Sequence, residues 1–233
     1  MLECSYLSKT KTSMSEINST RHKRDAEATM ARILAAAKSE FAGSGYGGAR
    51  IDVIAQRAEA NKRMIYHYFG NKEALFSRVL EEAYLDIRRA EQELDLEHLP
   101  VVEALERLVR FTWQYYLDNP EFLNLVNSAN LHKAVHIKDS AAIKRSTGSV
   151  VHTLAKVLER GAQEGVFKEN VNAVQLYISI AAIGYYYLTN RYTGSIIYQR
   201  DFMQPEALDE RLQFNLETIL SVACKGGYKP SMG

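Results

Sequence analysis

Two cations and two aromatic side chains lie close together in the segment KRMIYHYF, residues 62–69. Four side chains of this segment would fall within an arc of about 140° on an α-helix: Lys62, Arg63, Tyr66 and His67. The opposite arc, of about 100°, is apolar and holds Ile65, Tyr68 and Phe69. A face with cations and hydrogen-bonding rings but no acid suits contact with DNA phosphates and base edges. The alternative is a solvated helix face, although such a face usually includes acids.

The residues before this segment predict the helices that would hold it in place. An apolar residue recurs every three or four positions from residue 30 to residue 41, at Met30, Ile33, Leu34, Ala37 and Phe41. This spacing predicts an amphipathic helix. A second, shorter stripe follows at Ile51, Ile54, Ala55 and Ala58. Asn61 is expected to cap the third helix and Gly70 to end it, so the three form a helix-turn-helix arrangement.

The stretch GSGYGGAR, residues 43–50, carries four glycines between the first two predicted helices. A glycine-rich loop that binds phosphate follows a buried strand and precedes a helix, with a Lys-Ser/Thr pair or a downstream acid. Here a helix precedes the loop, and no Gly-Lys-Ser/Thr follows it. The glycines therefore predict a joint between helices instead of a nucleotide site.

Composition indicates an ordinary globular protein of 233 residues, with 46% hydrophobic residues and a net charge of +1. Residues 1–70 carry 11 Lys/Arg and 7 Asp/Glu, whereas residues 71–233 carry 18 and 21, so the first third is basic. No signal peptide is apparent, the apolar run 174–188 is short for a membrane span, and Cys4 and Cys224 have no metal-ligand spacing. We expect a cytoplasmic protein without a membrane partner, disulfide, metal or cofactor. The sequence also contains no nucleophile elbow, Walker loop or Rossmann loop, so no enzyme is predicted.

The chain divides into three predicted parts. Residues 1–24 are polar and basic and are expected to form a disordered arm. Residues 25–71 form the helix-turn-helix domain, and residues 72–233 form a second helical domain. Helices are expected at 72–94, 100–118, 120–132, 139–165, 172–193 and 206–224, with breaks marked by proline, glycine or asparagine. The predicted fold is therefore all-α.

Residues 32–80 resemble the DNA-binding domain of the TetR family of bacterial transcriptional regulators. The resemblance rests on Phe41 before Gly45-Tyr46, on Ile54-Ala55 and on KRMIYHYFGNKEAL, residues 62–75. It is weaker after residue 80, although the long final helices look like a TetR-type ligand-binding and dimerisation domain. Two positions differ from the family pattern. Glu59 replaces the usual glycine of the inter-helix turn, and Ala49-Arg50 replaces the usual capping Ser or Thr of the second helix.

The resemblance implies a repressor that binds a palindromic double-stranded DNA operator as a homodimer and is released by a small-molecule effector. Lys62 and Arg63 are the candidates for base contact. Phosphate contacts are expected from Arg50, Asn61, Tyr66, His67 and Lys72, with Tyr66 and His67 also able to meet a thymine methyl. The alternative is a helical small-molecule-binding or enzymatic protein whose first three helices only mediate an interaction.

Aromatic residues on the later helices are candidates for the effector pocket, although each also suits a plain core position. The aromatic candidates are Trp113, Tyr116, Phe122, Tyr177, Tyr185 and Tyr187. Arg191 is added as a cation that would orient a carboxylate or carbonyl group of the effector. His132 and His136 have the spacing of metal ligands on a helix, but no third ligand is evident. We therefore expect two surface histidines there.

Overall fold

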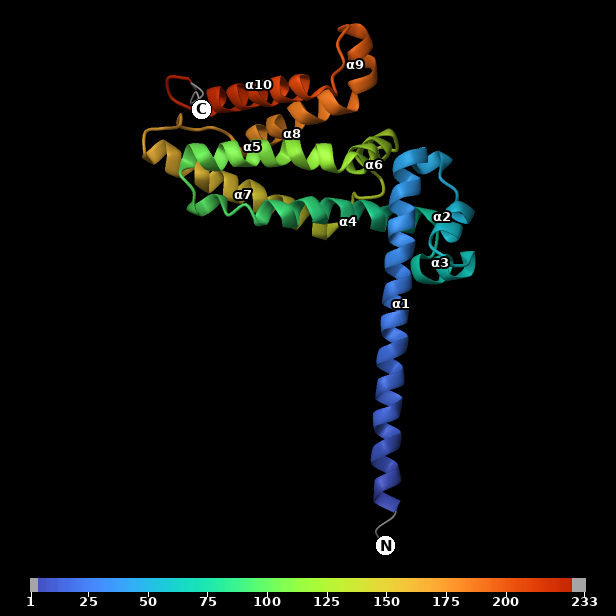
Figure 1. Cartoon of the computed structure of the whole chain (residues 1–233). Coiled ribbons are helices and arrows are strands. Elements are labelled where there is room, and N and C mark those ends of the chain that lie inside the picture. The colour runs from blue at the N-terminus through green and yellow to red at the C-terminus, as the bar shows by residue number, and fades with distance from the viewer. Residues whose placement is uncertain (1–3, 228–233) are drawn as a thin grey trace. The chain divides into compact units, whose positions relative to one another are not determined.

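The computed structural model describes the backbone of residues 4–227 and the side chains of residues 24–227. These residues form helices without a named strand, as the all-α prediction requires. The described backbone divides into two compact units, with the boundary between Val79 and Leu80. The helices are α1 (Cys4–Gly48), α2 (Ile51–Arg57), α3 (Lys62–Phe69), α4 (Lys72–Gln92), η1 (Leu96–His98), α5 (Val101–Asp118), α6 (Pro120–Leu131), α7 (Ala141–Gln163), α8 (Ala173–Thr189), α9 (Arg191–Ile197) and α10 (Pro205–Ala223) (Figure 1).

The first unit holds α1, α2, α3 and the first part of α4. Its core includes Phe41 from α1 and Phe76 from α4, whose ring centres lie 4.8 Å apart. Gly45 interrupts α1 with φ 67°, a conformation that glycine adopts at little cost. The glycine segment is thus a joint between helical pieces, as its sequence context predicts.

The first residues of the chain differ from the expected disordered arm. The helix α1 begins at Cys4, so the backbone of residues 4–24 is helical. This segment contains neither proline nor glycine, so no residue in it breaks the helix that continues into residues 25–48. Residues 1–3 lie outside the described part of the chain.

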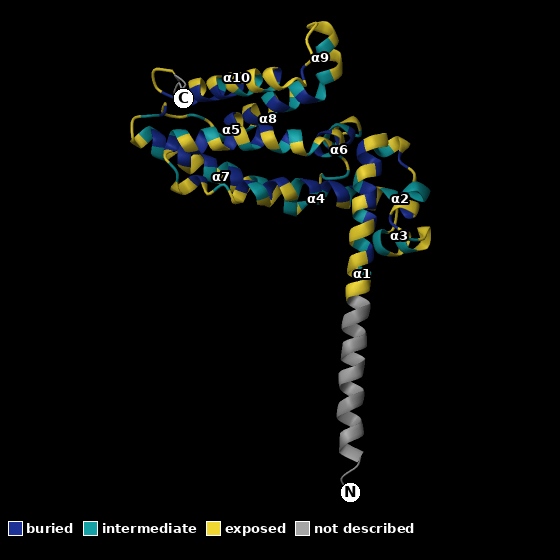
Figure 2. Ribbon diagram, in the orientation of Figure 1, coloured by how far each residue is buried: buried dark blue, intermediate teal, exposed yellow. Residues whose placement is uncertain are grey.

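The second unit is built around α5, which packs against α7, α8 and α10 (Figure 1). Apolar residues at helical spacing on α5 are buried, including Leu105, Leu108 and Trp113. Leu105 and Leu108 join a core that also takes in Leu154 from α7, Ile180 from α8 and residues of α10. Figure 2 shows the buried colour alternating with the intermediate and exposed colours along α5, and α10 with one exposed side.

The helix predicted over residues 172–193 is two helices in the structure. The first, α8, ends at Thr189, and Asn190 leaves helical geometry with φ −99° and ψ 15°. The Asn190 side chain donates a hydrogen bond to the Tyr186 carbonyl at 2.9 Å, which satisfies an acceptor at the end of α8. The short helix α9 then starts at Arg191. The helices predicted at 72–94, 100–118, 120–132, 139–165 and 206–224 agree with the structure to within about two residues.

None of the helices in the described part of the chain is both long enough and apolar enough to cross a membrane.

Candidate nucleic-acid interface and ligand-binding residues

The face of α3 predicted to meet DNA is open to solvent. Lys62, Arg63, Tyr66 and His67 are all exposed. Ile65, on the other side, is fully buried. The Asn61 side chain accepts a hydrogen bond from the Met64 N–H at 2.9 Å and so caps the helix, as predicted. The apolar side therefore fixes α3, and the cationic side is left free for a partner.

The turn before α3 has a strained backbone at Glu59. Glu59 adopts φ 49°, in the left-handed region where the family usually has glycine. The Ala60 N–H reaches back to the Ala55 carbonyl at 3.0 Å. Arg32 of α1 also donates to the Ala58 carbonyl at 3.2 Å. These bonds hold the turn despite a conformational cost of about 1 kcal/mol at Glu59.

A buried carboxylate that the sequence analysis did not single out organises the start of α2. Glu40 is 6% exposed. Its Oε1 accepts the Arg50 backbone N–H at 3.2 Å, and its Oε2 lies 3.1 Å from the Arg57 guanidinium. Glu40 thus satisfies the backbone N–H of Arg50, the N-cap residue of α2, whose own side chain makes no capping hydrogen bond. The only sequence signal for the burial of Glu40 is its position one residue before Phe41, a core residue of the same helix.

Arg50 and Lys72, the predicted flanking phosphate contacts, both have partners within the unit. Arg50 pairs with Asp52 at 2.8 Å, but the two side chains are 70% and 43% exposed. This contact raises the pKa of Arg50 and lowers the pKa of Asp52. An exposed pair of this kind is weak, so Arg50 remains available to a stronger anion. The Lys72 ammonium lies 5.1 Å from the centre of the Tyr46 ring, close to the Gly47 carbonyl.

Three of the predicted ligand-binding residues are packed together in the second unit. Trp113, Tyr116 and Phe122 are 3%, 6% and 5% exposed. The ring centres of Tyr116 and Phe122 lie 6.0 Å apart. Tyr185 donates to the Asn127 side chain at the edge of this group. Burial raises the pKa of both Tyr116 and Tyr185.

Tyr177 belongs to a buried polar cluster that includes two residues absent from the sequence-based candidates. Arg88 and Glu91 of α4 form an ion pair of 2.8 Å with side chains 8% and 1% exposed. The Tyr177 hydroxyl donates to Glu91 at 2.8 Å and accepts from Arg88. Burial raises the pKa of Glu91 to about 7, and Arg88 partly opposes that rise. The sequence analysis missed Arg88 and Glu91 because charged residues on a helix rich in charged residues give no sequence signal of burial.

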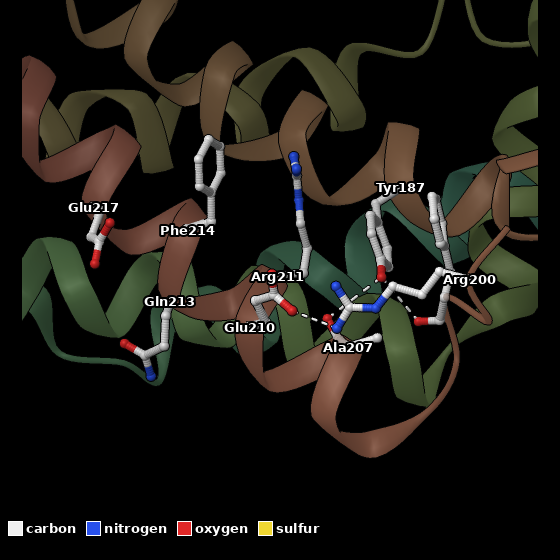
Figure 3. Close-up of a pocket in the computed structure, with 9 residues that line it drawn as sticks. Tyr187, Arg200, Ala207, Glu210, Arg211, Gln213, Phe214 and Glu217 are labelled. Atoms are coloured by element: carbon white, nitrogen blue, oxygen red, sulfur yellow. Dashed lines mark hydrogen bonds and ion pairs between the residues drawn. The ribbon is translucent and has the colours of Figure 1, made fainter. Parts of the chain in front are cut away.

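Tyr187 lines a separate groove between α8 and α10, with a volume of about 540 Å³. Its ring stacks on Phe202 with centres 4.4 Å apart. Figure 3 shows Arg211 and Phe214 of α10 beside Tyr187, and Arg200 joined to Glu210. Tyr187 therefore lines this groove, whereas Tyr177 belongs to the buried polar cluster. The ring centre of Tyr187 is nevertheless only 5.7 Å from that of Trp113.

Arg191 and the two histidines lie apart from the aromatic group. The Arg191 guanidinium donates to the Leu188 carbonyl at 2.9 Å and covers the Tyr192 ring. His132 and His136 follow the end of α6, with ring centres 5.9 Å apart. Among the residues with described side chains, no group of three His, Cys, Asp or Glu is placed to hold a metal ion.

Comparison with known proteins identifies the family. Residues 33–79 match the family described as "Bacterial regulatory proteins, tetR family", and residues 101–219 match "Tetracyclin repressor-like, C-terminal domain". The chain belongs to the TetR family. A TetR-family chain of this kind is a DNA-binding transcriptional regulator and not an enzyme, so the enzymatic alternative considered above is wrong.

Relatives of this TetR-family regulator support the same conclusion. It is 36% identical to the HTH-type transcriptional repressor NicS of Pseudomonas putida over 191 residues, 82% of this chain and 90% of NicS. It is 34% identical to the HTH-type transcriptional repressor SCO4008 of Streptomyces coelicolor, over 69% of this chain and 78% of that protein. The crystal structure of SCO4942 from Streptomyces coelicolor shares the fold, with a TM-score of 0.62 and 22% identity over 84% of this chain and 98% of that one.

Proposed function

We propose that this TetR-family regulator represses transcription by binding a palindromic operator as a homodimer, and that a small molecule releases it. The exposed face of α3 is the observation that carries the DNA-binding part. Two cations and two hydrogen-bonding rings point outward from a helix that is capped by Asn61 and held by Ile65. A helix presented in this way can enter the major groove and read base edges with Arg63.

The surroundings of each predicted DNA-contacting residue indicate whether it approaches a base or a phosphate. Lys62 and Arg63 have solvent around them and are proposed to approach bases. Arg50 and Lys72 sit at the starts of α2 and α4, where backbone N–H groups already favour an anion, and are proposed to bind phosphates. Asn61, Tyr66 and His67 are proposed to fix the register on the DNA backbone.

We further propose that the effector binds in the second unit, among Trp113, Tyr116, Phe122, Tyr177 and Tyr185, and that Tyr187 borders this site through its contact with Trp113. These residues come from α5, α6 and α8, and they combine large rings with hydroxyl groups near the Arg88–Glu91 pair. Because Arg191 caps the end of α8 with its own hydrogen bond, Arg88 is the better candidate for the cation that orients a polar ligand. The helix α4 carries both Lys72 and Arg88, so a shift of Arg88 has a direct route to the DNA-binding unit.

The operator proposal is tested by selecting binding sites from random duplexes and measuring affinity by gel shift between about 50 and 200 mM salt. We expect an inverted repeat whose half-sites are about 34–36 Å apart, bound with a steep loss of affinity as salt rises. Selection of sequences without two-fold symmetry, or binding that does not change with salt, would contradict the proposal.

A further inference from the structure

An acid of α2 lies beside the cationic face of α3. The helix α3 itself carries Lys62 and Arg63 and no Asp or Glu. Asp52 belongs to the first turn of α2. Its pKa is lowered mainly by the hydrogen bond from Arg50, and the charge of Lys62 adds to this effect. Asp52 is therefore close both to a proposed phosphate contact and to a proposed base contact.

The Arg50 guanidinium is held by both carboxylate oxygens of Asp52. Arg50 Nε donates to Oδ1 at 3.3 Å, and an Nη donates to Oδ2 at 2.8 Å. Arginine binds a phosphate in the same way, with two N–H groups directed at two oxygens. Asp52 thus occupies the edge of the guanidinium that would otherwise face a DNA phosphate.

The backbone of Arg50 is held independently of this pair. Its N–H donates to Oε1 of Glu40 at 3.2 Å, and Oε2 of Glu40 lies 3.1 Å from the Arg57 guanidinium. The Glu40 side chain is buried, so water competes little for these bonds. The Arg50 side chain, by contrast, is 70% exposed. The guanidinium can therefore leave Asp52 by rotation of its own side chain, while the start of α2 stays in place.

Binding of a phosphate by Arg50 has a cost that depends on Asp52. The Arg50–Asp52 pair must break, although an exposed pair of this kind contributes little to stability. The Asp52 carboxylate is then left near the phosphates without its partner, and like charges repel each other. Both effects oppose DNA binding.

We infer that Asp52 competes with DNA for Arg50: it holds the guanidinium in the free protein and weakens binding when a phosphate takes its place. No base takes part in this exchange, so Asp52 lowers the affinity for operator and unrelated duplexes alike. The inference rests on the proposed phosphate contact of Arg50 and adds an opposing residue to it. For a repressor that an effector must release, a lower affinity for the operator reduces the difference in effector binding that release requires.

Gel shifts between about 50 and 200 mM salt, on the selected operator and on a duplex of unrelated sequence, test this competition. Asparagine has nearly the shape of aspartate but no charge. We expect Asp52→Asn to bind both duplexes about three- to tenfold more tightly, with a salt dependence steeper by up to about one unit. In a protein that also carries Arg50→Ala, the same change should strengthen binding by less than about twofold.

Glu103→Gln is the matched control. Glu103 of α5 forms an exposed ion pair of 2.8 Å with Arg107, in the second unit. This variant changes the net charge by the same amount and also frees an arginine from an exposed pair, so its affinity for both duplexes should equal that of the parent. Thermal unfolding establishes that each variant is folded.

The outcomes separate the role of Asp52 from the phosphate contact on which it rests. Arg50→Ala that binds both duplexes as tightly as the parent overturns the phosphate contact. If Arg50→Ala weakens binding but Asp52→Asn leaves both affinities unchanged, the competition alone is overturned. An equal gain from Asp52→Asn with and without Arg50 also overturns it, because Asp52 would then act by charge repulsion alone. A loss of affinity confined to operators with one particular base would make Asp52 a base contact and overturn the competition as well.

Discussion

Arg63 and Lys72 are both cations of the DNA-binding unit, but their surroundings differ. Arg63 is exposed on α3, whereas Lys72 is half-buried and lies over the Tyr46 ring. We predict that Arg63→Ala weakens operator binding by about 1–3 kcal/mol and relaxes the preference for one base. Lys72→Ala should weaken operator and unrelated duplexes alike and make the salt dependence shallower by about one unit. Gel shifts on single-base operator variants measure both effects, and unchanged affinity in both proteins would contradict these roles.

Glu91 gives a prediction about stability and pH. Its pKa in the folded protein is about 7, above the ordinary value of 4.5, because burial disfavours the charged form. Between these two values the folded state binds more protons than the unfolded state, so the free energy of unfolding falls as pH rises from 5 to 7. The upper limit of the slope is about 1.4 kcal/mol per pH unit.

Glu91→Gln tests this link, because glutamine keeps the shape of the side chain and does not titrate. Urea unfolding at pH 5, 6 and 7 should show a decrease in stability for the parent protein and a flatter profile for the variant. Parallel pH profiles for the two proteins would contradict this prediction. They would show that Glu91 is ionised throughout this pH range and that Arg88 stabilises the Glu91 carboxylate.

At the scale of the element, α3 has only eight residues, so the cap at its N-terminus makes a large contribution to its stability. The Asn61 side chain satisfies the Met64 N–H, and no acid lies in the first turn to assist it. Asn61→Ala should destabilise the protein by about 1 kcal/mol. Asn61→Asp keeps a capping oxygen and should retain stability, but it adds a negative charge beside DNA and should weaken operator binding. Equal operator affinity for Asn61→Asp and the parent would place Asn61 away from the phosphates.

The sequence predicted elements well where local patterns determine them. The cap at Asn61, the joint at Gly45 and the turn at Glu59 follow from side-chain hydrogen bonding and backbone preference, which act over a few residues. The break at Asn190 was missed because apolar residues continue on both sides of it. The burial of Glu40 and Arg88 was missed for a different reason, since each depends on partners supplied by other helices.

At the scale of the whole molecule, the proposed effector must change the affinity for DNA through a difference between two states. It releases the operator only if it binds the DNA-incompatible state better, and tenfold release requires about 1.4 kcal/mol of difference. We predict that a releasing metabolite, found by gel shift, loses potency at least about tenfold in Trp113→Ala and in Tyr187→Ala. Equal potency in the parent and both variants would place the pocket elsewhere.

The position of Trp113 has a practical consequence. It is the only tryptophan among 233 residues, it is 3% exposed, and it lies where α5 meets α8. A Cβ added at Gly184 of α8 would lie 3.5 Å from its ring, so the indole senses small movements of the α8 backbone. Its ultraviolet emission should be blue-shifted, as for an indole shielded from water, and should come from one site alone. The natural, unlabelled chain thus carries its own optical probe of the helix packing through which an effector would act.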